Sequence, residues 1–446
     1  MTTRTSHFNR RTFLKSSAAL AGALGLPRWF VEENLAHAAA EEPKSPNDRP
    51  GVLLVGCGGM GTHDATVAAR FGTVLAVCDV DSNRLAEKAE KLKAEGKYTD
   101  FRKAISHKGI DVVVNGTPDH WHTLVNIHAM RAGKDVYSEK PLTLTIDEGR
   151  KLIAVARETK RILQTGSQQR SDAHFRLACE LVRNGRIGKL QQITTQLPSG
   201  PIGGPFATKP VPPELDWNFW LGQTPAVEYV PERCHVNFRF WYEYSGGTIT
   251  DWGAHHNDIA QWANGTERSG PVTVEGKVLQ EPIQGGYTTP PQYRVEYTYA
   301  NGVRLTCRTI DTETFSGSPS RKLSDEDERN GVRFEGTDGW LFVNREKIIA
   351  SRPEIIKEEL PASAVRLYVS SDHMGNFFDC VRTRKPAICE PEIGHRSVSV
   401  CHLGAIALRT GRKLAWDPAK EQFVGDPDAN TYISRPVREP WGYGAV

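Results

Sequence analysis

The sequence has no run of about 20 apolar residues, which is the length that a helix needs to cross a membrane. Its eight cysteines are scattered and include no C-x-x-C pair, so their spacing predicts neither a zinc site nor a disulfide scaffold. We expect most of them to be small buried side chains, with a disulfide among Cys380, Cys389 and Cys401 as the alternative. These absences argue against membrane-spanning, zinc-binding and disulfide-stabilised classes of protein.

The chain also lacks an excess of either charge. It has 56 lysines and arginines and 53 aspartates and glutamates, and the first 38 residues hold five of the basic and two of the acidic ones. The remainder, with 51 of each, predicts no nucleic-acid or membrane-surface partner. A length of 446 residues and a hydrophobic fraction of 39% are typical of a soluble protein with two or three domains.

The first 38 residues have the order of features found in a twin-arginine export signal. These features are Arg10-Arg11, Phe13-Leu14-Lys15, the weakly apolar run 16–26 and the A-x-A sequence Ala36-His37-Ala38. The alternative, a basic helix of the folded domain, does not account for this combination. We therefore predict a signal over residues 1–38, a linker over 39–50, and export of the folded protein to the periplasm or another extracytoplasmic compartment.

A dinucleotide-binding pattern follows the linker. Residues 52–55 predict a buried strand, residues 62–70 a helix and residues 74–77 a second strand, and Asp79 comes directly after it. The sequence G-x-G-x-x-G joins the first strand to the helix. This is the strand–turn–helix–strand context in which the glycine motif indicates a nucleotide site rather than an ordinary turn.

Each glycine of the motif has a separate physical role. Gly56 makes the tight turn, Gly58 lets the backbone approach a pyrophosphate, and Gly61 lets helix and strand pack closely. Gly59 and Met60 lie where the start of the helix offers unpaired N–H groups to the phosphates.

The acid at the end of the second strand predicts which nucleotide is bound. Asp79 can accept hydrogen bonds from the adenine-side ribose and would repel a 2′-phosphate, which favours NAD. Arg84 is close enough in sequence to leave NADP as the alternative.

Strand-like and helical stretches alternate from residue 51 to residue 166, which predicts a parallel, doubly wound sheet. Between residues 272 and 350, strand-like stretches predict an antiparallel sheet with turns at Asn301-Gly302 and Asp338-Gly339. We therefore expect an α/β protein. It would have an N-terminal doubly wound Rossmann domain over 51–166, a C-terminal α+β domain with a large open, mostly antiparallel sheet over 167–415, and a tail over 416–446.

Residues 197–240 are rich in proline, tryptophan and phenylalanine and show little periodicity, which predicts a long loop with a function. Its aromatic side chains would either stack on sugar rings or pack on the core. They are Trp217, Trp220, Phe238, Phe240 and Trp241.

The sequence Glu139-Lys140-Pro141 comes at the end of a predicted parallel strand, where ligands bind in open α/β sheets. Lys140 would lie beside a nicotinamide and stabilise the negative charge that develops on a reacting oxygen. The alternative is a solvated lysine at a strand end.

A second chemical cluster lies in the other half of the chain. If residues 250–258 are helical, Asp251, His255 and Asp258 share one face, and His256 points about 100° away. A carboxylate that orients an imidazole suits the removal of a proton from an alcohol. In the alternatives, Asp251 caps the helix, or the two histidines and Asp258 bind a metal. No fourth ligand is evident, and we predict no metal.

These motifs together resemble those of the Gfo/Idh/MocA oxidoreductases, the family of glucose–fructose oxidoreductase and the inositol dehydrogenases. The likeness covers residues 51 to about 415 in motif order. The matching segments are Gly56-x-Gly58-x-x-Gly61, Asp79, Thr117-Pro118-Asp119-His120-Trp121-His122, Glu139-Lys140-Pro141 and Asp251-x-x-x-His255.

The resemblance implies roles for individual residues. Lys140 would be the catalytic lysine and His255 the proton acceptor, assisted by Asp251, while Glu139 would contact the nicotinamide ribose. The residues implied to line the cofactor cleft further are Thr117, Pro118, His122 and Gln168. The substrate pocket of the family is variable, so we name as candidates, without a matching motif, Arg239, Glu243 and His235.

The implied activity is NAD(P)-dependent oxidation of a sugar, glycoside or polyol hydroxyl by a homodimer or homotetramer. An exported enzyme would need a tightly bound cofactor, restored in each cycle by a second sugar or by the first product. Restoration by the product gives the alternative of a redox-neutral glycosidase or lyase, and a non-catalytic sugar-binding protein is a third reading. The export signal and the 197–240 insertion are not general features of the family and leave the substrate open.

Overall fold

The computed structural model describes residues 21–22, 25–39, 49–315 and 328–443. The twin-arginine motif, most of the predicted linker and most of the charged stretch 316–330 lie outside the described residues. Residues 28–39, which we assigned to the signal up to residue 38, form helix α2 (Arg28–Ala39), whose Phe30 and Val31 are buried against the second domain. The signal boundary itself stays a prediction.

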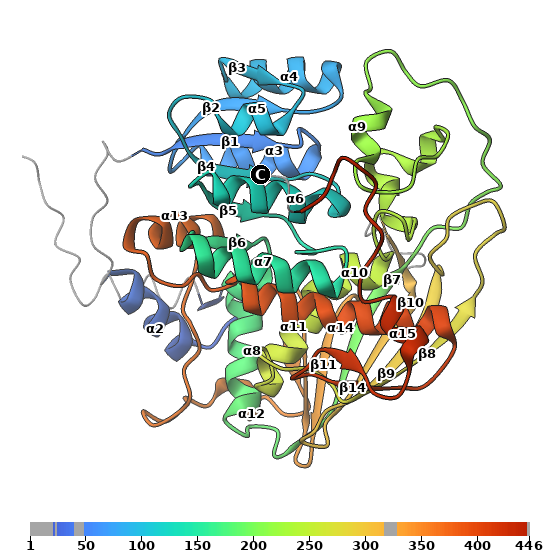
Figure 1. Ribbon diagram of the computed structural model, residues 1–446. Coiled ribbons are helices and arrows are strands. Elements are labelled where there is room, and N and C mark those ends of the chain that lie inside the picture. The colour runs from blue at the N-terminus through green and yellow to red at the C-terminus, as the bar shows by residue number, and fades with distance from the viewer. Residues whose placement is uncertain (1–20, 23–24, 40–48, 316–327, 444–446) are drawn as a thin grey trace, which may run out of the picture.

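The N-terminal domain is a six-stranded parallel sheet in the order β3-β2-β1-β4-β5-β6 (Figure 1). Its strands are β1 (Gly51–Val55), β2 (Thr73–Cys78), β3 (Gly96–Tyr98), β4 (Ile110–Asn115), β5 (Asp135–Ser138) and β6 (Leu163–Thr165). Its helices are α3 (Gly59–Ala68), α4 (Ser82–Leu92), α5 (Phe101–Ile105), α6 (Asp119–Arg131) and α7 (Ile146–Thr159). All five residues of β1 are buried, as expected of a central strand covered by helices on both faces. The predicted Rossmann fold is confirmed.

The strand register places the functional loops together. Val55 at the end of β1 pairs with Cys78 at the end of β2 and with Asn115 at the end of β4. Asn115 in turn pairs with Ser138 at the end of β5. The glycine turn, Asp79, the β4–α6 loop and Glu139-Lys140 therefore lie along one edge of the sheet.

The C-terminal domain has a nine-stranded sheet in the order β13-β12-β11-β7-β10-β9-β8-β14-β15. The strands are β7 (Leu190–Ser199), β8 (Thr273–Gln280), β9 (Gln292–Thr298), β10 (Arg304–Thr314), β11 (Gly331–Gly336), β12 (Trp340–Val343), β13 (Ile348–Ala350), β14 (Leu414–Asp417) and β15 (Gln422–Phe423). Neighbouring strands are antiparallel except β7 and β10, which are parallel. The predicted large, mostly antiparallel sheet is confirmed, whereas β13, β14 and β15 were not predicted, because each is short.

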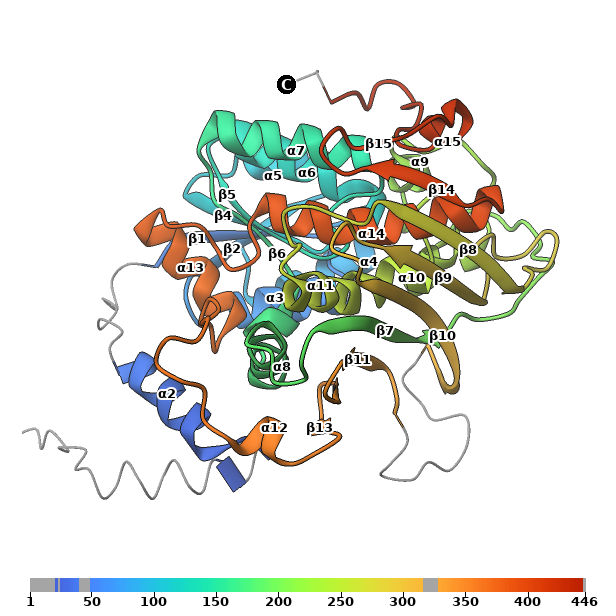
Figure 2. The same cartoon turned by 90° about the horizontal axis from the view of Figure 1, so that it is seen from below.

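Helices cover one face of this sheet (Figure 2). The helices of this domain are α8 (Ala173–Arg183), α10 (Thr248–Asp251), α11 (Gly253–Asn264), α12 (Glu354–Lys357), α13 (His373–Thr383), α14 (Pro391–Thr410) and α15 (Pro427–Thr431). Helix α14 begins with a proline in its first turn, a position where the missing N–H costs no hydrogen bond. A short 3-10 helix, η1 (Gln168–Ser171), joins the two domains.

The proline- and aromatic-rich segment is not a structureless loop. It contains α9 (Trp217–Leu221), η2 (Pro231–Arg233) and η3 (His235–Phe240). Its five candidate aromatics are all buried in one cluster of their own, so they pack on each other rather than present free rings to solvent.

The C-terminal tail runs back beside α9 to the Rossmann domain (Figure 1). Trp441 packs against Trp121 and Phe219, with ring centroids 5.2 and 4.9 Å away, and the guanidinium of Arg102 lies 5.1 Å from its ring. Arg438 donates to the carbonyl of Gly222 at 2.8 Å, just after α9. The tail therefore fixes the inserted segment to the nucleotide domain.

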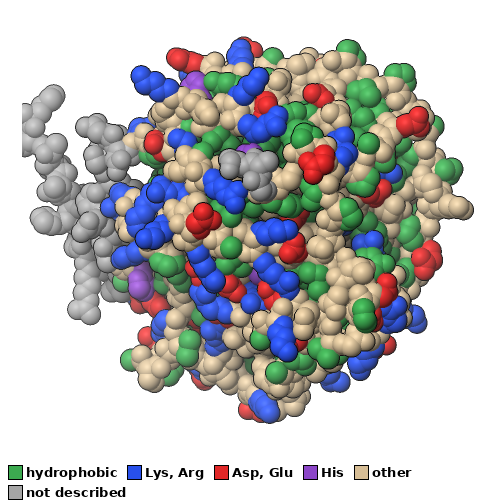
Figure 3. All heavy atoms as spheres, viewed as in Figure 1, with side chains coloured by type: hydrophobic (Ala, Val, Ile, Leu, Met, Phe, Trp, Pro, Cys, Tyr) green, Lys and Arg blue, Asp and Glu red, His purple; other side chains and the backbone are tan. Residues whose placement is uncertain are grey.

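On the face shown in Figure 3, acidic and basic side chains are interspersed, in agreement with the balanced charge of the sequence. Within the described residues, no helix combines the length and apolar character needed to span a membrane.

Candidate active site

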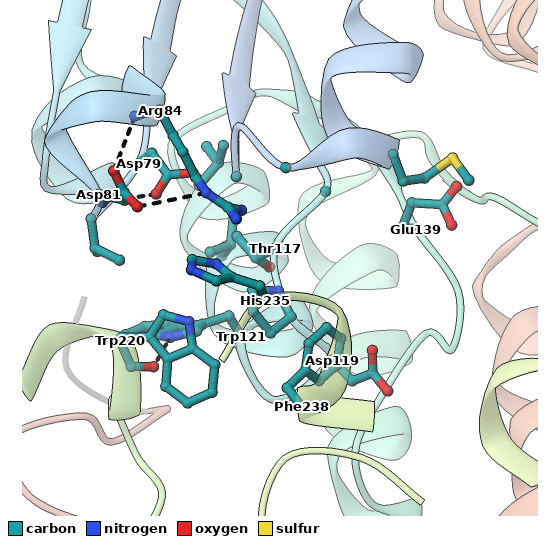
Figure 4. A pocket seen from close by; sticks show the side chains of 18 of the residues that line it. Asp79, Asp81, Arg84, Thr117, Asp119, Trp121, Glu139, Trp220, His235 and Phe238 are labelled. Carbon is teal, nitrogen blue, oxygen red and sulfur yellow. Dashed lines mark hydrogen bonds and ion pairs between the residues drawn. The ribbon is translucent and has the colours of Figure 1, made fainter. Parts of the chain in front are cut away.

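A cleft of about 290 Å³ lies between the carboxyl edge of the Rossmann sheet and the inserted segment. We call the Rossmann side the cleft floor; it comprises the glycine turn, Asp79, the β4–α6 loop and Glu139-Lys140. We call the opposite side the cleft roof; it is formed by Leu215, Phe219, Trp220, His235, Val236, Phe238 and Arg239. Figure 4 shows Asp79 and Arg84 at one end of the cleft and Glu139 at the other.

The glycine turn has the shape that a pyrophosphate requires. Gly56 has φ +91°, and a Cβ there would lie 2.6 Å from the carbonyl oxygen of Gly116. A Cβ on Gly61 would overlap the carbonyl oxygen of Gly56, whereas Gly59 faces open space. Helix α3 starts at this turn with Gly58 as its N-cap and no side-chain cap, so its first N–H groups are free for an anion.

At one end of the cleft, Asp79 is fixed by two backbone donors. It accepts from Cys57 N at 2.6 Å and from Asp81 N at 2.9 Å, and burial raises its pKa. Arg84 lies over the turn and pairs with Asp81, with 3.6 Å between Nε and Oδ2. The arrangement leaves the remaining lone pairs of Asp79 available to ribose hydroxyls.

The β4–α6 loop forms the middle of the floor. Thr117 donates to Asn115 Oδ1 at 2.7 Å, and Pro118 is the N-cap of α6. His122 lies with its ring nitrogens 2.9 Å from the Thr117 carbonyl and 2.7 Å from the Pro141 carbonyl. Burial lowers the pKa of His122 to about 4, and the neutral ring can donate its single N–H to only one of these two carbonyls.

Glu139 lies at the other end of the floor and is almost fully buried. Gln168, just past the crossover to the second domain, donates to its Oε1 at 3.3 Å. Burial raises the pKa of Glu139 to about 7. A second buried carboxyl, Asp64 of α3, acts on it and has its own pKa raised by burial and by Glu139.

Lys140 meets the second domain at this same end. Its Nζ donates to Asp251 Oδ1 at 2.6 Å, and Arg239 of the roof donates to the same oxygen from Nε at 3.1 Å. Burial would raise the pKa of Asp251, but the two cations outweigh it and lower this pKa to about 2. A lysine from the first domain and an arginine from the inserted segment therefore bind one carboxylate of the second domain.

His255 is one helical turn beyond Asp251 and is 5% exposed. Its Nδ1 is buried and has no hydrogen-bond partner. Burial, together with the nearby charges of Lys140 and Arg345, holds the pKa of His255 well below its usual range. The ring is therefore neutral and able to accept a proton.

The expected sharing of one helix face is wrong in part. The carboxylate of Asp258 is fully buried and pairs with Arg170 at 2.7 Å, because Arg170 needs a counter-charge in the core. Asp251 is held by Lys140 and Arg239, and the described contacts include no bond from it to His255. His256 points elsewhere, as predicted, and contacts Asn330 at 2.7 Å.

Two of the three candidate substrate residues do not lie beside Lys140. His235 is at the other end of the cleft, where the charges of Arg84 and Asp81 act on it (Figure 4). Glu243 lines a different small cavity and pairs with Arg233 at 3.0 Å. Both candidates rested on composition alone. Arg239 does lie at the site, bound to Asp251.

Several residues of the cleft were not found from the sequence. Asp119 is buried, binds the hydroxyl of Ser245, and has its pKa raised by burial to about 7. The roof residues Leu215, Phe219 and Val236 carry no motif, and their only signal was the aromatic-rich composition of the insertion. Arg345, near His255, was also missed.

The described residues contain no group of three or more His, Cys, Asp or Glu side chains placed to hold a metal ion. All eight cysteines are buried free thiols, so the alternative of a disulfide among Cys380, Cys389 and Cys401 is wrong in this structure.

Family models match most of the chain. The NAD-binding Rossmann fold of the Gfo/Idh/MocA oxidoreductase family matches residues 51–167, and the C-terminal alpha/beta domain of that family matches residues 204–443. A twin-arginine translocation signal matches residues 7–27.

Relatives and solved structures agree with this match. The chain is 29% identical over 230 residues to myo-inositol 2-dehydrogenase of Thermotoga maritima, which covers 51% of this chain and 58% of that enzyme. It is 27% identical to scyllo-inositol 2-dehydrogenase (NAD(+)) of Bacillus subtilis, covering 83% and 97%. It is also 27% identical over 207 residues to a glycosyl hydrolase family 109 protein of Shewanella pealeana, covering 41% and 44%.

Among solved structures, the aldose-aldose oxidoreductase of Caulobacter crescentus superposes with a TM-score of 0.61 at 19% identity, covering 82% of this chain and 99% of that one. The WlbA dehydrogenase of Bordetella pertussis gives a TM-score of 0.61 at 16% identity, covering 83% and 99%. At such identities these two structures support the fold alone. With both of its domains matched by the family models, the chain belongs to the Gfo/Idh/MocA oxidoreductase family.

Proposed function

We propose that this protein oxidises a hydroxyl of a sugar, polyol or glycoside with a bound nicotinamide cofactor. The observation that carries the proposal is that Lys140, which lines the cleft, binds Asp251 and acts on the pKa of His255, whose buried Nδ1 has no hydrogen-bond partner. The inositol dehydrogenases among the relatives support a polyol or sugar as the class of substrate.

We expect NAD to lie along the length of the cleft. The open glycine turn would hold the pyrophosphate, Asp79 the adenine-side ribose, and Glu139 the ribose of the nicotinamide. When bound, NAD supplies the acceptor for the electron pair and hydrogen that leave the substrate carbon. Asp79 favours NAD over NADP, because its carboxylate would repel a 2′-phosphate. Arg84 is already paired with Asp81, so it is less available to bind the 2′-phosphate of NADP.

Lys140, Asp251 and His255 have separate roles in the transfer of the hydroxyl proton. His255 accepts the hydroxyl proton, since its ring is neutral and its Nδ1 is unpartnered. Lys140 donates a hydrogen bond to the oxygen as negative charge develops on it. Asp251 holds the ammonium of Lys140 in place, and the buried surroundings strengthen this ion pair by excluding water.

We further propose that the cofactor is retained tightly. The roof is tied to the floor by backbone bonds from Ser82 N to Glu214 O and from Asp216 N to Val80 O, at 2.9 and 3.0 Å. The tail then fastens the roof through Trp441. Release of the cofactor would require opening this aromatic cluster.

Tight retention of the cofactor would suit a protein with an export signal. A protein exported in the folded state to the periplasm or another extracytoplasmic compartment would carry its cofactor with it, as a homodimer or homotetramer. The cofactor must then be restored within each cycle, either by a second carbohydrate or by the first product.

Redox-neutral cleavage of a glycoside is a second candidate, favoured by the match to glycosyl hydrolase family 109 proteins. Oxidation of one hydroxyl would make the neighbouring C–H acidic. Loss of that proton and departure of the aglycone with its bonding electrons would leave an unsaturated ketone. Water would then add to it, and the electrons would return to the sugar.

The test is to purify the protein and identify by mass any nicotinamide nucleotide that it carries. Sugars, polyols and nitrophenyl glycosides are then added, while the near-ultraviolet absorbance of reduced nicotinamide and the release of nitrophenol are followed. Reduction of the bound cofactor with formation of a keto product supports the oxidoreductase, and aglycone release without net reduction supports the second candidate. A protein that binds sugars but turns over none of them would be the non-catalytic alternative and would contradict both.

A further inference from the structure

Arg345 lies beside His255, on a segment far from both in the sequence. It belongs to the turn between β12 and β13, and its guanidinium carbon lies 4.8 Å from the ring centroid of Trp252. Trp252 joins α10 to α11, between Asp251 and His255, and its ring is 5.9 Å from that of His255. The hairpin thus brings a cation to the residues that flank the proposed base.

Gln169 links this cation to the base. With its amide oriented to satisfy both neighbours, Gln169 accepts from Arg345 Nε at 3.2 Å and donates to the His255 carbonyl at 3.2 Å. This contact holds the Nε side of the guanidinium and does not involve its two terminal nitrogens. Among the described residues, neither makes a hydrogen bond or an ion pair, and Arg345 as a whole is exposed.

Of the cations Lys140, Arg239 and Arg345, Arg345 is the one that does not donate to Asp251. Lys140 and Arg239 both donate to Asp251. Burial against Trp252 lowers the pKa of Arg345, while the charges of Asp172, Asp251 and Glu139 raise it. Asp172 lies beyond ion-pair distance and caps α8 through His174 N, at 2.8 Å.

Arg345 lies near the proposed base but outside the cofactor cleft, whereas Lys140 lines the cleft. In the proposed function a substrate hydroxyl lies between Lys140, His255 and the nicotinamide. A sugar that extends from there away from the cleft would approach Trp252 and Arg345.

We infer that Arg345 is a specificity-determining residue that binds an oxyanion group on the carbohydrate, so that the preferred substrate is an acidic sugar. The inference rests on the proposed function and names its substrate class. A guanidinium with a free fork binds a carboxylate through two parallel hydrogen bonds, and a sulfate or phosphate ester offers the same oxygens. Trp252 beneath it holds the guanidinium flat.

The experiment compares matched neutral and acidic sugars on the full-length protein with its bound cofactor. The pairs are glucose with glucuronate and galactose with galacturonate, and the corresponding sugar sulfates and phosphates identify the source of the oxyanion. We expect kcat/KM to favour one acidic partner by roughly 10-fold or more, the size of a charge-assisted pair. In Arg345→Gln the ratio of kcat/KM for the acidic sugar to kcat/KM for its neutral partner should fall to about one, with the loss on the acidic sugar appearing mainly in KM, and Arg345→Lys should restore part of the ratio.

The matched control is Arg333→Gln. Arg333 also lies over a tryptophan, 4.2 Å from the ring of Trp340, but it is already paired with Glu335 at 2.8 Å. Its loss should leave the preference for the acidic sugar unchanged. Equal losses on neutral and acidic sugars in Arg345→Gln, or no acidic preference in the wild type, would overturn the inference.

Failure of the proposed function is separable from failure of this inference. If no sugar reduces the cofactor, binding of the same pairs is measured by calorimetry. Acid-selective binding that Arg345→Gln abolishes would uphold the role of Arg345 without the chemistry. Absence of acid-selective binding would overturn it.

Discussion

The floor and the roof of the cofactor cleft are held by different forces. The floor consists of strand ends and loops fixed by backbone geometry, such as the left-handed turn at Gly56 and the two backbone donors on Asp79. The roof consists of aromatic side chains of an insertion, and the Trp441 ring of the tail fastens it. The comparison teaches that the floor positions chemistry to a fraction of an ångström, while the roof controls entry and exit. Changes in the floor should therefore alter rate and cofactor choice, and changes in the roof should alter retention.

The largest effect is expected at the floor residue Lys140. Lys140→Ala should lower the rate of cofactor reduction by about 10²–10⁴-fold, because the reacting oxygen loses its charged donor. The measurement is single-turnover absorbance of the bound nicotinamide. Lys134→Ala is the matched control at the other end of β5, where Lys134 donates to the Ile110 carbonyl at 2.7 Å, and it should react normally. A similar loss of reduction rate in both variants would mean that the substitutions had disturbed strand β5 rather than removed a catalytic group.

A smaller effect is expected on cofactor choice. Asp79→Asn keeps the shape of the side chain but removes the charge that repels a 2′-phosphate. The ratio of NADP to NAD affinity should rise by roughly 10- to 100-fold, measured by calorimetry on nucleotide-stripped protein. Asp111→Asn, which also loses a carboxylate that accepts a backbone N–H (Gly51 N, 2.8 Å), should not change the ratio. An unchanged ratio in Asp79→Asn would remove this residue from nucleotide selection.

The roof should respond differently. Trp441→Ala removes the ring that packs on Trp121 and Phe219. The release rate of the cofactor should rise about 10-fold or more, since each 1.4 kcal/mol of lost roof stability is worth a factor of about ten. The rate of reduction while the cofactor stays bound should be unchanged. Trp340→Ala, in strand β12 of the second sheet, is the control. Faster release in both variants, or slower chemistry in Trp441→Ala alone, would break the distinction between floor and roof.

The floor and the roof of the cleft differ in how many of their residues could be predicted from the sequence. The glycine turn and Asp79 were found from the sequence because their geometry depends on neighbours within one strand–turn–helix unit. Lys140 and His255 were candidates from the strand end and the helix spacing, and the family resemblance gave them their roles. The structure brings Lys140 close enough to act on the pKa of His255. The partner of Asp251 was assigned wrongly, because helix periodicity reports neighbours at four residues but not a lysine 111 residues away.

The roof and Arg345 depend on long-range packing. The five aromatics of the insertion had two readings in the sequence, and only the tertiary contacts decide that they form a cluster of their own. Arg345 is one of many charged residues in hairpin turns, and nothing in its neighbourhood in sequence indicates that Trp252 lies beneath it.

The last effect concerns stability. Asp119 has its pKa raised by burial from 3.8 to about 7, so the folded state holds a proton that the unfolded state has lost between these pH values. The contribution of Asp119 to stability should therefore fall as pH rises from about 4 to about 7, and then level off. Asp119→Asn should flatten this decline, by on the order of 2–4 kcal/mol, in urea unfolding at several pH values. A wild-type stability that rises over the same range, with no change in Asp119→Asn, would show that Asp119 is ionised in the fold.

The central claim is that Lys140 and His255 act on the same hydroxyl proton and oxygen. The most direct test is the single-turnover reduction rate of Lys140→Ala, His255→Ala and the double variant, each with its cofactor bound. The account predicts a large loss in each single variant and a loss in the double variant well below the product of the two, because the residues work as one unit. Near-normal rates in either single variant, or fully multiplicative losses in the double variant, would contradict it.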